Sequence, residues 1–264
     1  MCHSEVPAGQ LTPEVESREV VIPVGWANMP ALLARPGSAR PGSAVTASVL
    51  VVSDIFGRSP FYENLGARLA AAGFQALVPE IFFRQGPLPE RTMDAAVARR
   101  AQLDENQTQR DLLAAVDWLR TRQSGPRVGT IGFCMGGTHT LDLAARRDDL
   151  VTVTFYGYPA RLPEATERTA PAPLEVAGKM RGPILGFWGD QDQLAGLENV
   201  EMLRTVLTQR GLDFDLTVYP GLGHGFMAAS GFDPGHIAYE AACDAWDRTV
   251  AFLQAHLAGG EAPG

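Results

Sequence analysis

The sequence predicts an α/β fold with a mostly parallel central sheet and helices on both faces. Short runs of β-branched and apolar residues alternate with longer amphipathic segments over most of the 264 residues. The runs are too short for helices and almost continuously apolar, as expected for strands buried on both faces. The chain shows no internal repeat of fixed period. We therefore expect one large domain, residues 18–264, after an irregular lead-in of residues 1–17.

Eight strands are expected in chain order. The first two form an antiparallel pair, and they are followed by six buried strands: Ser17–Val24, Met29–Ala34, Ala47–Ser53, Gln75–Val78, Arg127–Gly132, Val151–Phe155, Pro183–Trp188 and Phe214–Tyr219. Residues 35–44 repeat a turn-forming Arg-Pro-Gly-Ser-Ala unit and predict an exposed loop.

Six helices are expected between and after these strands. Their apolar residues fall largely on one helical face, and the last helix closes the chain: Phe61–Ala72, Arg91–Leu103, Gln107–Thr121, Met135–Arg147, Asn199–Gln209 and Gly235–Leu257.

Composition excludes several classes of protein. The net charge of −8 comes without a basic stripe, which argues against a nucleic-acid surface. No apolar run approaches the roughly 20 residues that cross a bilayer, and no secretory leader is visible. We therefore expect a cytoplasmic protein without a membrane partner. Three widely spaced cysteines form neither a disulfide framework nor a Cys-x-x-Cys metal motif.

The stretch Gly-Phe-Cys-Met-Gly, residues 132–136, places Cys134 in the turn between an expected strand and an expected helix. Glycines two residues before and after a nucleophile permit its strained backbone and the close strand–helix packing of a nucleophile elbow. The N-terminus of a helix also favours a thiolate. The alternative is a buried structural cysteine, because free cysteine is among the most buried residue types.

A nucleophile of this kind needs a base and an orienting carboxylate. His224 lies in a glycine-rich loop directly after the strand Phe214–Tyr219, where its ring can reach the carboxyl edge of the sheet. Asp190 and Asp192 both follow the strand Pro183–Trp188, and the Gly-x-x-Asp pattern from Gly189 favours Asp192. The order nucleophile, acid, histidine, with the last two on loops after later strands, is one of the orders that catalytic triads use on α/β folds.

These motifs resemble the dienelactone hydrolase (carboxymethylenebutenolidase) family of the α/β-hydrolase fold. The resemblance rests on Gly-Phe-Cys-Met-Gly-Gly, on the Gly189–Asp192 turn, on Gly-His-Gly-Phe around His224, and on the stretches 49–57 and 78–86. It implies a hydrolase of small esters or lactones that forms an acyl-enzyme on Cys134. It implies no metal or other cofactor, a small-molecule substrate, and a monomer or small homo-oligomer.

The resemblance also implies further site residues. The backbone N–H groups of Ile55 and Met135 form the oxyanion hole. Asp54 occupies the position of an acid that holds the resting thiol, although the family more usually has glutamate there. Arg84 matches an arginine that binds a substrate carboxylate, and Phe56 and Phe226 border the substrate.

One family feature is missing. The family has a second arginine four residues after the catalytic histidine, where this chain has Ala228. Arg58 is a possible replacement or an ordinary surface arginine. The missing arginine favours a second hypothesis, a broad-specificity carboxylesterase or thioesterase. A third is a non-catalytic ligand-binding protein on the same scaffold, and the complete set of Cys134, Asp192 and His224 argues against it.

Overall fold

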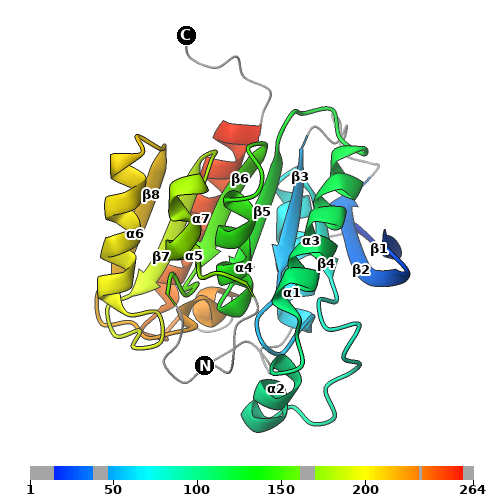
Figure 1. Ribbon diagram of the computed structural model, residues 1–264, viewed down its shortest axis with the longest axis horizontal. Coiled ribbons are helices and arrows are strands. Elements are labelled where there is room, and N and C mark those ends of the chain that lie inside the picture. Colours follow the sequence, from blue (N-terminus) through cyan, green and yellow to red (C-terminus); the bar gives the residue numbers. More distant parts are fainter. Residues whose placement is uncertain (1–14, 38–46, 161–169, 232–233, 258–264) are drawn as a thin grey trace.

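The computed structural model describes residues 15–37, 47–160, 170–231 and 234–257. Its strands form one eight-stranded sheet in the order β1-β2-β4-β3-β5-β6-β7-β8 (Figure 1). β1 and β2 are antiparallel to each other, β2 is antiparallel to β4, and all other neighbours are parallel. The strands are β1 Val15–Val24, β2 Ala27–Pro36, β3 Ser48–Val52, β4 Gln75–Pro79, β5 Val128–Phe133, β6 Leu150–Phe155, β7 Ile184–Gly189 and β8 Phe214–Tyr219.

Helices cover both faces of this sheet. The α-helices are α1 Pro60–Ala71, α2 Met93–Arg100, α3 Glu105–Arg120, α4 Met135–Ala144, α5 Pro173–Val176, α6 Leu197–Gln209 and α7 Tyr239–Leu257, with 3-10 turns η1 Ala177–Lys179 and η2 Phe226–Gly231. In Figure 1, α3, α4 and α6 lie in front of the sheet and α7 lies behind it. The predicted mostly parallel sheet with helices on both faces is confirmed.

The N-terminal boundary differs from the expected one. Val15 and Glu16, which we assigned to the irregular lead-in, are the first residues of β1, because they pair with Pro36 and Arg35 of β2. The start of the strand was missed because residues 16–19 are consecutive polar, exposed residues on the edge strand of the sheet. Residues 1–14 of the lead-in and residues 38–44 of the expected loop lie outside the described residues.

Capping residues set several helix starts. Asp104 accepts a hydrogen bond from the Gln107 N–H at 2.9 Å, and Thr92 accepts one from the Ala95 N–H at 3.3 Å. The cap at Thr92 starts α2 at Met93, and the helix ends at Arg100, so α2 is shorter at both ends than the expected segment 91–103. The short helix α5 and both 3-10 turns were not expected, because segments of so few residues carry no readable periodicity.

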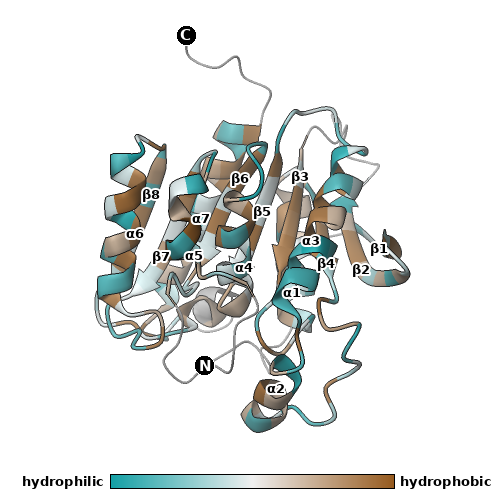
Figure 2. Ribbon diagram, in the orientation of Figure 1, coloured by the Kyte–Doolittle hydropathy of each residue, from teal (hydrophilic) through white to brown (hydrophobic). Residues whose placement is uncertain are grey.

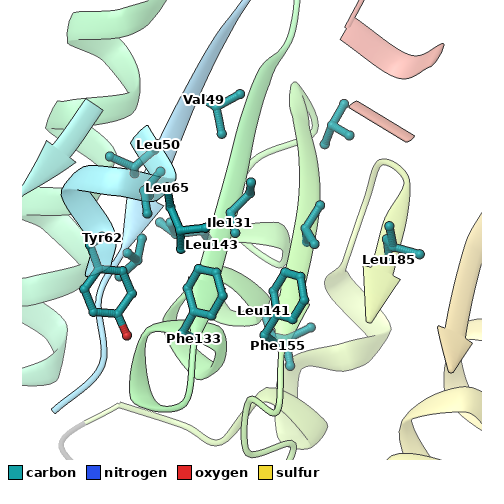
Figure 3. Close-up of a cluster of buried hydrophobic side chains, with 14 of the residues drawn as sticks. Val49, Leu50, Tyr62, Leu65, Ile131, Phe133, Leu141, Leu143, Phe155 and Leu185 are labelled. Carbon is teal, nitrogen blue, oxygen red and sulfur yellow. The ribbon is translucent and has the colours of Figure 1, made fainter. Parts of the chain in front are cut away.

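Strands β3 to β7 are buried along their whole length. Figure 2 shows β3 in brown, while the Gly- and Thr-containing β5 is paler. Phe133, at the end of β5, is fully buried, and its ring stacks on Phe155 with centroids 4.7 Å apart. Tyr62 of α1 meets the same ring edge-on at 5.5 Å. Figure 3 shows these three rings side by side. This aromatic cluster fixes the end of β5, from which the Cys134 turn starts.

No α-helix among the described residues is both long and apolar enough to cross a bilayer.

The Phe133→Ala variant should lower the free energy of unfolding by about 3–5 kcal/mol, because it removes a buried ring and leaves a cavity among other rings. Trp26→Ala provides the control, since the Trp26 side chain is fully exposed at the β1–β2 turn. Denaturant unfolding of both variants measures the difference. A loss below about 1 kcal/mol for Phe133→Ala would contradict the described packing.

Candidate active site

Cys134 lies in a sharp turn between β5 and α4, with backbone angles φ 56° and ψ −121°. A positive φ is strained for a side chain other than glycine. The flanking glycines allow the turn for steric reasons. A Cβ on Gly132 would lie 2.1 Å from the Gly136 carbonyl oxygen, and one on Gly136 would lie 2.3 Å from the Val52 carbonyl oxygen. The turn thus places Cys134 at the N-terminus of α4, beside the carboxyl end of β3.

The turn after β7 brings Asp192 to the histidine. His224 Nδ1 lies 2.9 Å from Asp192 Oδ2, and both side chains are almost fully buried. The other carboxylate oxygen, Oδ1, accepts hydrogen bonds from the N–H groups of Leu194 at 3.0 Å and Ala195 at 3.1 Å. These two donors hold the carboxylate in its orientation towards the imidazole.

Asp190, the competing aspartate, has a different partner. Its Oδ1 accepts a hydrogen bond from the Gly221 N–H at 2.7 Å, and the Asp190 N–H donates to the Tyr219 carbonyl. It thereby ties the turn after β7 to the loop after β8. The structure places Asp192, and not Asp190, against His224.

Burial opposes protonation of His224, but hydrogen bonds to Asp192 and Cys134 outweigh it and raise the pKa of His224 to about 9. The ordinary value is 6.5, so the buried pair stabilises the imidazolium. The arrangement places a protonated His224, oriented by Asp192, beside the Cys134 sulfur. A thiolate is the nucleophilic form of cysteine.

Two backbone N–H groups near the cysteine are available to a ligand. Met135 is the first residue of α4 and Ile55 lies in the turn after β3; within the described part of the chain neither N–H is bonded to an acceptor. The Ile55 turn is held by hydrogen bonds from Gly57 N–H to the Asp54 carbonyl (3.0 Å) and from Phe56 N–H to Asp54 Oδ1 (2.8 Å). Such donors can bind an oxyanion.

Arg99 of α2 also supports this turn and was not singled out in the sequence. Its Nη2 donates to the Ile55 carbonyl at 3.2 Å, and its guanidinium lies over the Phe82 ring at 3.9 Å. Arg99 is almost fully buried, and this burial lowers the pKa of its guanidinium, although the carboxylates of Glu80 and Asp54 favour the charged form. No short motif marks such a residue, because the contact joins segments 44 residues apart.

Asp54 is completely buried directly after β3. Its carboxylate accepts a hydrogen bond from the Phe56 N–H, and its own N–H donates one to the Tyr62 hydroxyl oxygen at 3.1 Å. The residue before it, Ser53, has its carbonyl oxygen 2.4 Å from a Cβ built on Gly136. Asp54 therefore lies next to the cysteine turn, and its action on the thiol stays a prediction.

Arg84 is engaged elsewhere. Its guanidinium forms a two-point ion pair with Asp111 of α3, Nε–Oδ2 2.8 Å and Nη2–Oδ1 2.9 Å, and Nη2 also donates to the Val24 carbonyl at 3.4 Å. It borders a hollow beside the β1–β2 turn, together with Trp26 and Gln107. The described contacts do not bring Arg84 to Cys134. Arg58 is likewise paired, with Glu19 and with Glu63.

The two predicted substrate-bordering phenylalanines lie apart from each other in the packing. Phe226 meets Tyr156 edge-on at 5.5 Å, and Tyr156 in turn meets the His224 ring at 4.9 Å. Phe56 packs with Ile55 and Ala96 in a small separate cluster that joins the turn after β3 to α2. Ala228 lies in η2 and brings no charge.

Tyr158 is a second residue that the sequence reasoning missed. It follows β6, and its hydroxyl oxygen lies 3.0 Å from Cys134 Sγ and 3.3 Å from His224 Nε2. The signal available was the polar aromatic pair in Tyr-Gly-Tyr-Pro, residues 156–159, at the carboxyl end of a strand next to β5. Among the described residues no group of three His, Cys, Asp or Glu side chains is placed to hold a metal ion.

Comparison with known proteins agrees with this geometry. The profile of the dienelactone hydrolase family matches residues 29–257. This chain belongs to the dienelactone hydrolase family. A carboxymethylenebutenolidase from Rhodococcus opacus is 34% identical over 262 residues, which cover 99% of this chain and 100% of the relative.

Solved structures show the same α/β-hydrolase fold. A Klebsiella pneumoniae protein provisionally assigned as a dienelactone hydrolase has a TM-score of 0.79 and 30% identity, over 91% of this chain and 99% of that one. The acylaminoacyl peptidase of Pyrococcus horikoshii has a TM-score of 0.72 at 16% identity, over 95% of this chain and 43% of that one, and shows the fold alone. The predicted family, fold and hydrolase class are confirmed.

In this dienelactone hydrolase family member, the imidazole of His224 should titrate near pH 9, with the charged form present below it. Asp192→Asn should lower that midpoint, because it removes the carboxylate that stabilises the imidazolium. NMR shifts of the His224 ring against pH measure both midpoints. An equal midpoint in the variant would contradict the assigned partner.

The same shift has a consequence for stability. Since the pKa of His224 in the folded chain lies above the ordinary 6.5, its contribution to folding is complete below about pH 6.5 and is lost as the pH rises through about 9.

Proposed function

We propose that this hydrolase cleaves small esters or lactones by nucleophilic catalysis through Cys134, His224 and Asp192. The observation that carries the proposal is the buried imidazole of His224, hydrogen-bonded to Asp192 on one side and to Cys134 on the other. The positive φ of Cys134 and the open N–H groups of Ile55 and Met135 support it. No step needs a metal or another cofactor.

In the first half-reaction the Cys134 thiolate attacks the substrate carbonyl carbon, and the carbonyl oxygen becomes an oxyanion. The N–H groups of Ile55 and Met135 bind that oxyanion, an effect typically worth several kcal/mol. As the tetrahedral intermediate collapses, the C–O bond to the leaving group breaks, and the imidazolium of His224 gives its Nε2 proton to the leaving oxygen. The products are a thioester on Cys134 and a neutral imidazole.

Acylation also prepares the second half-reaction. The thiolate is one of the groups that raise the pKa of His224, and it no longer exists once the sulfur is acylated. The pKa of His224 is therefore lower in the acyl-enzyme, and its imidazole is neutral at a lower pH than in the free enzyme. Neutral His224 then takes a proton from water, whose oxygen attacks the thioester, and the thiolate leaves.

A broad-specificity carboxylesterase or thioesterase is the second candidate function, and one specific observation favours it. Arg84 is held by Asp111 in a two-point ion pair, and Ala228 stands where a second family arginine would be. Neither position offers a free guanidinium to a substrate carboxylate. Substrates without a carboxylate should therefore be accepted as well as those with one.

Cys134→Ala should reduce kcat for p-nitrophenyl acetate at least about 1,000-fold, because covalent catalysis is lost while the fold stays intact. Cys243→Ala is the matched control, since Cys243 lies on α7 and its substitution should leave kcat unchanged. Intact-protein mass spectrometry after rapid quenching should show one added acyl group on the wild type. Full turnover by Cys134→Ala would refute the mechanism.

The carboxylate preference can be measured directly. A dienelactone carboxylate and its neutral methyl ester should have lactone-hydrolysis kcat/KM values within about threefold of each other, because a free bidentate arginine is the feature that would separate them. A preference of about 100-fold for the carboxylate would show that an arginine does reach the substrate. Asp111→Asn, which releases Arg84 from its partner, provides the comparison variant.

A further inference from the structure

The Tyr158 hydroxyl lies against both reacting groups of the proposed pair. Its oxygen is 3.0 Å from Cys134 Sγ and 3.3 Å from His224 Nε2, and the residue is only 8% exposed. The sulfur, the hydroxyl and the imidazole thus form a compact triangle, since His224 is also hydrogen-bonded to the cysteine itself.

Several restraints keep the hydroxyl in this place. The Tyr158 N–H donates to Thr138 Oγ1 of α4 at 2.8 Å, which ties the residue to the helix that follows Cys134. Its ring stacks on the His224 ring with centroids 5.5 Å apart and planes 6° from parallel. The preceding carbonyl, of Gly157, accepts the Trp188 indole N–H at 2.9 Å. The hydroxyl is therefore held by backbone and ring contacts that do not involve the sulfur.

We propose that Tyr158 is a further catalytic residue, whose hydroxyl donates a hydrogen bond to the Cys134 sulfur and so stabilises the thiolate that attacks the substrate. The proposal rests on the function proposed above. The proton balance is simple: the thiol proton moves to Nε2 of His224, the sulfur keeps the electron pair, and the tyrosine keeps its own proton. Hydrogen bonds to charged groups are the strong ones in proteins.

A donor to the thiolate has two opposite effects on reactivity. It increases the fraction of sulfur present as thiolate at a given pH, and it makes each thiolate a weaker nucleophile. Loss of the hydroxyl should therefore slow the cysteine at low pH and leave it equal or faster at high pH. Ring packing alone would produce neither effect.

Two other titratable groups contact His224 and stay in place when the hydroxyl is removed, Asp192 from the loop after β7 and Tyr156 from the same segment as Tyr158. Asp54 is buried in the turn after β3, beside the cysteine turn, and is also unchanged. The Arg99 guanidinium, on α2, interacts electrostatically with the Asp54 carboxylate. A change seen on removing only the Tyr158 oxygen is therefore assigned to that oxygen.

The test is the rate of Cys134 alkylation by iodoacetamide as a function of pH, without substrate, in the full chain. Mass spectrometry of the Cys134 peptide follows the reaction, and the Cys243 peptide in the same sample is an internal control. In Tyr158→Phe the pH midpoint for Cys134 should rise by about one unit or more, because a hydrogen bond to a charged group is lost. The rate at the high-pH plateau should not fall.

Two further variants separate the hydroxyl from the ring. Tyr158→Met also lacks the hydroxyl and should show the same rise, so a shift in only one variant would assign the effect to packing and overturn the proposal. Tyr219→Phe is the matched control, because the Tyr219 hydroxyl bonds to Asp244 of α7, and its midpoint should equal that of the wild type.

The outcomes distinguish the role of Tyr158 from the proposed hydrolysis through Cys134. An unchanged midpoint in Tyr158→Phe refutes the role of Tyr158 alone, and a lowered midpoint shows that the hydroxyl accepts from the thiol instead, which also refutes it. Hydrolysis that survives Cys134→Ala refutes the proposed function, whatever the alkylation midpoints are.

Discussion

The close approach of Gly132 to Gly136 is the constraint on which the candidate site depends. A Cβ on Gly132 would lie 2.1 Å from the Gly136 carbonyl oxygen, so the end of β5 and the start of α4 meet at a distance that only glycine allows. This contact forces the chain at Cys134 into a positive φ and lifts its side chain out of the turn. The first N–H groups of α4 point to the same place because the turn leads directly into the helix.

The parallel strands bring the remaining groups to this turn. β3, β6, β7 and β8 run in the same direction as β5, so the segments after them all end at one edge of the sheet (Figure 1). Asp54, Tyr158, Asp192 and His224 follow these four strands in that order. At this edge the His224 imidazole lies between the Asp192 carboxylate and the Cys134 sulfur.

Much of the fold was predictable from the sequence because fully buried strands and amphipathic helices have distinct patterns. Cys134, Asp192 and His224 could be selected because each lies within a glycine-rich turn after an expected strand, and the structure brings the three together. The edge strand β1 was less clear, since its exposed side chains interrupt the apolar pattern. The starts of α2 and α3 coincide with single capping residues, Thr92 and Asp104, which periodicity does not reveal.

Contacts between distant segments could not be predicted. Tyr158 and Arg99 meet the site through packing between neighbouring strands and helices, and neither belongs to a recognisable motif. Arg84 shows the opposite case, because its motif indicated a ligand and only the structure reveals Asp111 as its partner. A residue type in a motif says which bonds are chemically available, and the tertiary structure decides which of them is made.

In the ion pair between Arg84 and Asp111, a carboxylate of the protein itself occupies the guanidinium and would compete with any carboxylate ligand for it. Asp111 is attached to the same chain, so its carboxylate confronts the guanidinium at an effective concentration that no dissolved acid matches. A free carboxylate would have to displace this tethered one and replace both of its hydrogen bonds. Selectivity against anionic ligands can thus arise without any repulsive group, simply because the attractive one is already occupied.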